Sequence, residues 1–210
     1  MDTARGMTGS WRRYVPERAR HLMGIDVKGT VSLGLWFARR KHGVPDGALP
    51  VPYASGGSAL FYVVLFSIVV ETIAVEALIR GLDLTATAGA VSLALHAWAV
   101  LAVLITAAAY VTRPHVVTDE YVRVRHGAFF DLRIPRAQIT GASLTRVYDA
   151  DDGVTVSAGV LGVAVASQTN VVLTLAAPVE VVRPLGGRAR ASTVRLYADD
   201  PAAALRALAG

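Results

Sequence analysis

The chain has 210 residues, and 53% of them are apolar. Its mean hydropathy of +0.46 is high for a soluble protein and favours membrane segments. The absence of cysteine excludes disulfides, thiolate metal ligands and cysteine nucleophiles.

The positive charge is concentrated near the amino terminus. Residues 1–50 hold nine Lys and Arg residues against four Asp and Glu residues, a difference of +5 that equals the net charge of the whole chain. Basic charge ahead of an apolar region is typical of a segment at an anionic membrane surface. No recognition motif or aromatic platform indicates nucleic acid, so no nucleic-acid partner is expected. We interpret residues 1–58 as a basic, cytoplasmic amino-terminal segment.

A short helix is predicted over residues 26–43, DVKGTVSLGLWFARRKHG. Asp26 is a suitable N-cap, the last turn is basic, and Gly43 is a typical stop signal. The segment is too short to span a bilayer. Residues 44–58 follow, and their prolines and glycines predict a linker.

Two interpretations of this helix stay open. In the first it lies at the membrane interface, with Trp36 at headgroup level and Arg39, Arg40 and Lys41 on lipid phosphates. In the second it is a short helix packed against the later domain.

A transmembrane hairpin is predicted over residues 59–111. Its two apolar runs, 59–79 and 84–111, each reach the roughly 20 residues that a spanning helix needs. Thirteen large apolar residues in the first run favour insertion by about 4 to 8 kcal/mol. A central carboxylate such as Glu71 opposes it by roughly 2.5 to 3.5 kcal/mol, so the helix is still expected to insert.

The orientation follows from the basic residues that flank the hairpin. Three precede it (Arg39, Arg40, Lys41), three follow it (Arg113, Arg123, Arg125), and the connecting loop holds Arg80. By the positive-inside rule both termini are cytoplasmic and the protein is a multi-pass protein of the plasma (inner) membrane.

Beyond the hairpin, apolar and polar residues alternate with period two, which indicates strands. Asp200 and Pro201 then introduce a final helix as N-cap and first helical residue. We expect residues 115–210 to form a small, mainly-β barrel or sandwich with a C-terminal helix. The strand-like segments are 121–125, 130–134, 142–148, 154–158, 162–166, 170–175, 179–183 and 192–198.

Residues 116–147, VVTDEYVRVRHGAFFDLRIPRAQITGASLTRV, resemble the bacterial pleckstrin-homology-like (PH-like) domains that follow transmembrane hairpins. Residues 197–208, YADDPAAALRAL, are similar to the last strand and helix of that family. The resemblance implies seven strands in two near-orthogonal sheets, with a C-terminal helix across one open end. It also implies a generic scaffold for lipid or peptide binding.

Two pairs of ionisable residues are candidate sites in the hairpin. If its turn is centred near residues 83–84, Glu71 and His96 lie at equal depth, and small residues beside each allow close approach. We predict an intramembrane polar pair that fixes helix register or mediates oligomer contact. Proton or substrate handling and an unknown protein partner are the alternatives. Glu76 and Arg80 are predicted to form an ion pair at the outer interface.

Basic residues are candidate contacts for an anionic inner leaflet. For the pair in the first strand the alternative is a solvated strand face, and for the trio around the Gly-Gly turn it is a solvated hairpin tip. The eight candidates are Arg39, Arg40, Lys41, Arg123, Arg125, Arg183, Arg188 and Arg190.

Enzyme signatures are absent from the sequence: it holds no P-loop, dinucleotide-binding, G-x-S-x-G or H-E-x-x-H motif, and its histidines lack metal-ligand spacing. We expect no catalytic residue, cofactor or metal. The expected function is a non-enzymatic integral membrane protein that displays a cytoplasmic PH-like binding or scaffolding domain. Its expected partners are the bilayer, an unknown protein and a second copy of the chain. The alternative is a small oligomeric transporter or channel component using Glu71 and His96.

Overall fold

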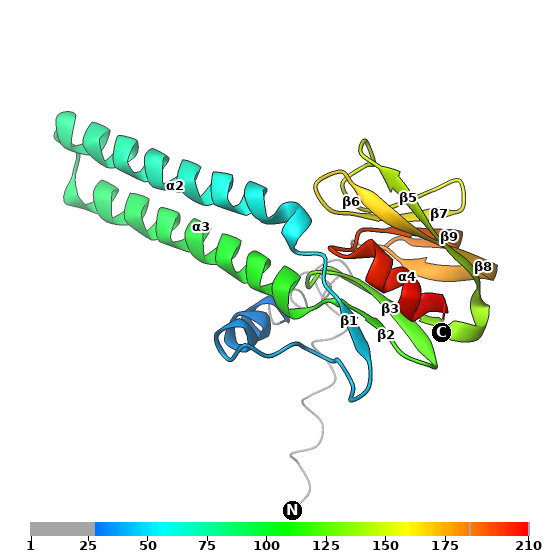
Figure 1. Cartoon of the computed structure of the whole chain (residues 1–210). Helices are drawn as coiled ribbons and strands as arrows, with labels where there is room; N and C mark the ends of the chain where they lie inside the picture. The colour runs from blue at the N-terminus through cyan, green and yellow to red at the C-terminus, as the bar shows by residue number, and fades with distance from the viewer. Residues whose placement is uncertain (1–27, 185, 210) are drawn as a thin grey trace, which may run out of the picture.

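The computed structural model describes residues 28–184 and 186–209. Two long helices project side by side from one end of a β domain (Figure 1). Helix α2 (Ser55–Gly81) and helix α3 (Ala86–Thr112) have 27 residues each. Within the described residues, these are the two helices long and apolar enough to cross a membrane. The two predicted apolar helices are therefore confirmed, with α2 starting four residues earlier than expected.

Helices α2 and α3 pack against each other, and each uses one face for the contact. Side chains of α2 that are partly shielded recur every three or four residues, a spacing typical of one helix face against a neighbour. They include Phe61, Leu65, Ile68, Thr72, Val75 and Ile79. At the tip, the Thr85 hydroxyl accepts a hydrogen bond from the Ala88 N–H at 3.3 Å and caps α3.

The hairpin is inserted between two paired strands. Strand β1 (Leu49–Val51) precedes α2, strand β2 (His115–Val117) follows α3, and the two pair antiparallel. The segment predicted as a linker, 44–58, thus holds a strand and the start of α2. Pro50 has no backbone N–H to donate to a neighbouring strand. It is tolerated because β1 is an edge strand with a neighbour on one side only.

The β domain consists of two sheets in the described residues. The first has the order β1-β2-β3-β4, and the second has the order β5-β8-β9-β7-β6 with β7 and β9 parallel. A 3-10 turn, η2, connects the sheets, and helix α4 ends the chain. The bounds are β3 Tyr121–His126, β4 Phe130–Pro135, η2 Arg136–Gln138, β5 Ile139–Val147, β6 Gly153–Ser157, β7 Val160–Ala164, β8 Thr169–Val182, β9 Arg188–Leu196 and α4 Pro201–Ala209.

The hydrophobic core lies between the two sheets, with α4 beside it (Figure 1). Alternate residues of each strand are buried, as the period-two pattern predicts. The core residues include Val122, Val124 and Ile134 from the first sheet, Leu161, Val171, Leu173 and Val194 from the second, and Ala204 from α4.

A mainly-β domain with a C-terminal helix is therefore confirmed, but a closed barrel is not present. In the described residues no strand pairing joins the two sheets, and Pro135 and η2 interrupt the chain between β4 and β5. The strands predicted at 170–175 and 179–183 are one strand, β8. Its pairing with β9 is irregular between Thr174 and Val179, which accommodates Pro178.

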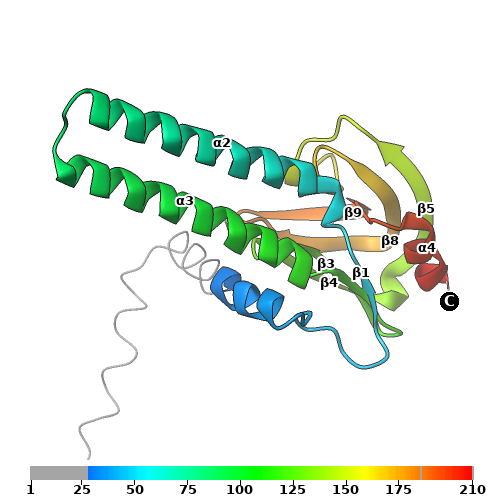
Figure 2. The same ribbon diagram turned by 60° about the vertical axis from the view of Figure 1, so that its left-hand side comes forward.

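The amino-terminal helix lies along the foot of α3, as Figure 2 shows; its described part covers residues 28–37. Contact is close at Gly29, where a Cβ atom would lie 2.7 Å from Ile105 Cγ2. The opposite side stays open, because Phe37 is 76% exposed and Trp36 39% exposed. The helix thus packs on protein and also keeps an exposed aromatic surface. Residues 26–27 of the predicted helix lie outside the described residues, and residues 38–43 are not helical.

Candidate functional site at the foot of the hairpin

Five polar side chains are buried where the hairpin meets the first sheet. We call these residues the junction cluster: Tyr53, Arg113, His115, Arg125 and His126. They come from the segments just before α2 and just after α3, and from the end of β3. Buried polar groups are destabilising unless they are hydrogen-bonded, so their partners define what the cluster does.

Tyr53 connects the hairpin to the β3–β4 turn. Its side chain is fully buried, its hydroxyl donates to the Arg113 carbonyl oxygen at 3.0 Å, and it accepts from the Gly127 N–H at 2.7 Å. Burial raises the pKa of Tyr53, so the phenol stays protonated. The hydroxyl thereby satisfies two backbone groups at the point where helix gives way to strand.

Arg125 holds the loop before β1. Its side chain is 1% exposed, Nη1 donates to the His42 carbonyl oxygen at 2.8 Å, and Nη2 donates to the Gly43 carbonyl oxygen at 3.3 Å. Burial lowers the pKa of Arg125 to about 10, and the nearby charge of Arg123 acts in the same direction. Gly43 has φ +56°, and a Cβ there would lie 2.9 Å from Nη2, so the position favours glycine.

Arg113 holds the amino-terminal helix. Its Nε donates to the buried Ser32 hydroxyl at 2.8 Å, and Nη2 donates to the Lys28 carbonyl oxygen at 3.0 Å. One residue earlier, the Thr112 carbonyl oxygen accepts from the His42 N–H at 2.7 Å. The end of α3 is therefore bonded to both ends of the segment 28–42.

His115 is held as the neutral tautomer with its proton on Nε2. Nδ1 accepts from the Arg125 N–H at 3.0 Å, and Nε2 donates to the Tyr197 carbonyl oxygen at 3.1 Å. Burial lowers the pKa of His115 to about 3. This ring joins the first sheet to the end of the second, since Tyr197 directly follows β9.

His126 and α2 add two further connections. The Tyr110 hydroxyl of α3 is hydrogen-bonded to His126 Nε2, and burial lowers the pKa of His126 to about 4. At the start of α2, the Ser55 N–H and hydroxyl both donate to the Asp199 carboxylate. A carboxylate at a helix N-terminus also interacts favourably with the helix dipole.

The predicted contact between Glu71 and His96 is absent from the described part of the chain. Glu71 is exposed, and the His96 Nδ1–H donates to the Ser92 carbonyl oxygen at 2.8 Å. Two residues at equal depth need not face each other, because the rotation of each helix about its axis also matters. Thr72 and Val75 face α3, and Glu71, one residue before Thr72, points about 100° away around the helix. Glu71 therefore lies on the outer side of α2.

Glu76 is the carboxylate that faces α3. Its Oε1 is buried and has no hydrogen-bond partner, and Oε2 lies 3.7 Å from where a Cβ on Gly89 would sit. No ion pair between Glu76 and Arg80 is formed in residues 28–184.

The predicted lipid contacts on the β domain are partly occupied by protein. Arg123 makes a two-point ion pair with Asp131, at 2.7 and 2.6 Å, and Arg125 is buried in the junction cluster. Arg188 pairs with Glu180 at 2.8 Å. Arg183 and Arg190 are exposed.

The predicted trio Arg39, Arg40 and Lys41 lines a hollow beside the end of α3. The hollow has a volume of about 560 Å³, and its other lining residues are Trp36, Phe37, Val111 and Thr112. All three basic side chains are exposed. We call this feature the basic hollow.

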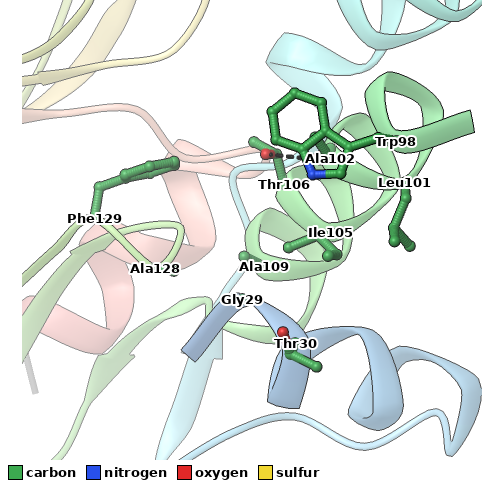
Figure 3. A pocket seen from close by; sticks show the side chains of 10 residues that line it. All are labelled: Gly29, Thr30, Trp98, Leu101, Ala102, Ile105, Thr106, Ala109, Ala128 and Phe129. Carbon is green, nitrogen blue, oxygen red and sulfur yellow. Dashed lines mark hydrogen bonds between the residues drawn. The ribbon is translucent and has the colours of Figure 1, made fainter. Parts of the chain in front are cut away.

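A second cavity, of about 340 Å³, lies between the amino-terminal helix, α3 and the β3–β4 turn (Figure 3). Trp98, Leu101 and Ile105 come from α3, and Phe129 comes from the turn. Its lining is mainly apolar, and the Thr106 hydroxyl is bonded to the Ala102 carbonyl oxygen. It has the character of an apolar crevice rather than a reaction site.

The contacts of the junction cluster attach the hairpin and the amino-terminal segment to the first sheet. Tyr53, Arg113, His115 and Arg125 bond to backbone atoms across segment boundaries, and His126 bonds to the Tyr110 hydroxyl while its Nδ1 has no partner in the described part of the chain. In the described residues no group of three or more His, Asp or Glu side chains could hold a metal ion. From the sequence, Tyr53, His115 and His126 were not identified, and Arg113 was used only as a flanking basic residue that indicates orientation. The available signal was the polar run Arg113–His115 directly after an apolar helix, just before a β segment.

Comparison with protein-family models, with curated proteins and with solved structures gives no match.

Acid is expected to loosen the junction. His115 and His126 stay neutral in the folded chain but ionise near pH 6.5 when unfolded, so stability is complete above pH 6.5 and falls as the pH drops toward 4. At pH 5 the loss is about 2 kcal/mol for each histidine. Thermal unfolding in detergent at pH 7.5 and pH 5 measures it.

The variants His115→Gln and His126→Gln should each reduce the difference between the two pH values, and the double variant should reduce it further. Equal unfolding temperatures for the parent chain at both pH values would contradict the assignment.

Proposed function

We propose that this chain is an integral membrane protein that displays a PH-like β domain at the cytoplasmic face of the plasma membrane, as a non-enzymatic binding or scaffolding module. One observation carries the proposal: the hairpin is inserted between β1 and β2, which are paired neighbours in the first sheet. A hairpin joined in this way holds the β domain at a fixed distance from the bilayer, whereas a long linker would let that distance vary.

The dimensions of the helices support membrane anchoring. Twenty-seven residues at about 1.5 Å each give roughly 40 Å, which matches a hydrocarbon core of about 30 Å plus headgroup layers. Large apolar side chains remain exposed along α2 and α3, among them Phe66, Ile73, Leu95 and Trp98. Lipid would cover this surface, and the charges at the foot of the hairpin favour the cytoplasmic side for the β domain.

The β domain itself offers a binding surface. Strand β5 is at the edge of the second sheet, and its pairing with β8 is irregular between Leu144 and Val147. Leu144 is 49% exposed and Tyr148, just beyond the strand, is 66% exposed. An open edge beside apolar side chains suits an extended peptide that adds as a further strand. PH-like scaffolds, which the sequence resembles, are generic supports for such binding.

A small oligomeric transporter or channel component is the second candidate. The observation that favours it is the exposed Glu71 on the outer side of α2, because a carboxylate at mid-depth costs about 2.5 to 3.5 kcal/mol unless a neighbour shields it. A single pair of helices is too thin to enclose a path, so this function needs several copies.

Topology is tested by labelling single cysteines in a chain that has none. Asp83→Cys, at the tip of the hairpin, should react with a membrane-impermeant maleimide in intact bacterial cells. Ser143→Cys, exposed on β5, should react only after the membrane is permeabilised. Labelling of Ser143→Cys in intact cells would contradict the cytoplasmic placement of the β domain.

Ion flux separates display from transport. The display function predicts that proteoliposomes with the parent chain and with Glu71→Gln show the same background proton and ion flux, while oligomer size can change. Glu76→Gln is the matched control, since Glu76 faces α3 instead of lipid. A flux in the parent chain that Glu71→Gln abolishes would instead establish transport.

A further inference from the structure

We propose that the basic hollow binds the headgroup of an anionic phospholipid from the inner leaflet. The inference rests on the proposed membrane insertion and adds a defined lipid site to it. The hollow lies between the end of the amino-terminal helix and the last turn of α3.

The level of the hollow matches the phosphate layer. Helices of about 40 Å extend beyond a hydrocarbon core of about 30 Å, so when the tip lies at the outer surface, the last turn of α3 lies among the inner headgroups. Val111 and Thr112 form that last turn and also line the hollow. A lipid alongside α3 would therefore present its phosphate to Arg39, Arg40 and Lys41.

Within residues 28–184 and 186–209, the three cations have no anionic partner. Ion pairs in the described residues involve Arg123, Arg125 and Arg188, and none involves the trio of the hollow. Their charge is thus free to attract a phosphate, with roughly a five-fold preference for anionic lipid from each cation near the surface.

The walls of the hollow favour a lipid over a free phosphate ion. Trp36 and Phe37 pack against each other with ring centroids 5.7 Å apart, and both line the hollow with Val111. Aromatic side chains at the membrane interface contact the region where headgroup and acyl chain join. A site with an apolar wall and a cationic rim fits an amphipathic molecule, whereas inorganic phosphate would leave the wall unused.

The hollow is also held in shape before any lipid binds. Gly29 and Ser32 fasten the helix to α3 and Arg113, and the His42 N–H bonds to the Thr112 carbonyl oxygen just beyond the basic trio. The helix ends with the Arg40 N–H on the Leu35 carbonyl oxygen at 2.9 Å, and Arg39 has φ +53°. Binding to a pre-formed site loses less conformational entropy than binding to a mobile segment.

The test uses Trp36 as a reporter. The full chain with Trp11→Phe and Trp98→Phe is placed in nanodiscs of phosphatidylcholine with a minority of phosphatidylglycerol, and brominated acyl chains are carried by one lipid or the other. We expect brominated phosphatidylglycerol to quench Trp36 well beyond its mole fraction. The double variant Arg40→Gln, Lys41→Gln should reduce the quenching toward that fraction, with about a five-fold loss of preference for each cation. Arg39 is retained because it ends the helix.

Matched controls decide between the outcomes. Arg146→Gln with Arg190→Gln removes two exposed charges that do not line the hollow and should leave the preference unchanged. Quenching in proportion to mole fraction in the parent chain, or a preference that survives the Arg40 and Lys41 variant, overturns the lipid site but not membrane insertion. Displacement by inorganic phosphate, beyond the effect of sodium chloride at equal ionic strength, overturns it in favour of a free anion. Absence of quenching by either brominated lipid would place Trp36 away from the acyl chains and would also overturn the lipid site, whereas membrane insertion of the hairpin is tested separately by the cysteine labelling.

Discussion

The two long apolar helices leave and re-enter the β domain through neighbouring strands of one sheet, and the rest of the structure depends on this constraint. Paired strands lie about 4.8 Å apart, whereas packed helices lie about 8–10 Å apart, so the chain must diverge at the boundary. At this boundary, backbone N–H and C=O groups no longer have partners in a neighbouring strand. The Tyr53 hydroxyl supplies two of the missing hydrogen bonds, because it donates to the Arg113 carbonyl oxygen and accepts from the Gly127 N–H.

The same boundary explains two buried arginines. Arg113 and Arg125 are 5% and 1% exposed, and hydrogen bonds to their donors offset the cost of burying a charge. Among the described residues, the Nε of Arg125 has no hydrogen-bond partner and lies 3.7 Å from the Asp131 carboxylate. Both arginines donate to backbone carbonyl oxygens of the amino-terminal segment, at Lys28, His42 and Gly43. That segment is therefore bonded to the hairpin and to the first sheet. Hairpin, amino-terminal helix and sheet form one body, which also holds the basic hollow beside α3.

Sequence patterns predicted most helices and strands but not the contacts that connect them. Long apolar runs predicted α2 and α3, and alternation predicted most strands, because both signals are local in the chain. Strand β1 was missed, since three residues with a central proline carry no period and form a strand only through pairing with β2. Glu71 and His96 were matched by depth, but helix rotation depends on the whole packed face. Arg125 fits an alternating surface strand, and only the approach of His42 and Gly43 buries it.

The central claim is that hairpin and β domain are one rigid unit. It is tested most directly by the distance distribution between two spin labels, one on Ala94→Cys of α3 and one on Ser143→Cys of β5, in the full chain in nanodiscs. Both positions are exposed, and the chain has no cysteine of its own. A rigid junction predicts a single narrow distribution, limited by the labels themselves. A broad distribution, as a flexible linker would give, would contradict the account.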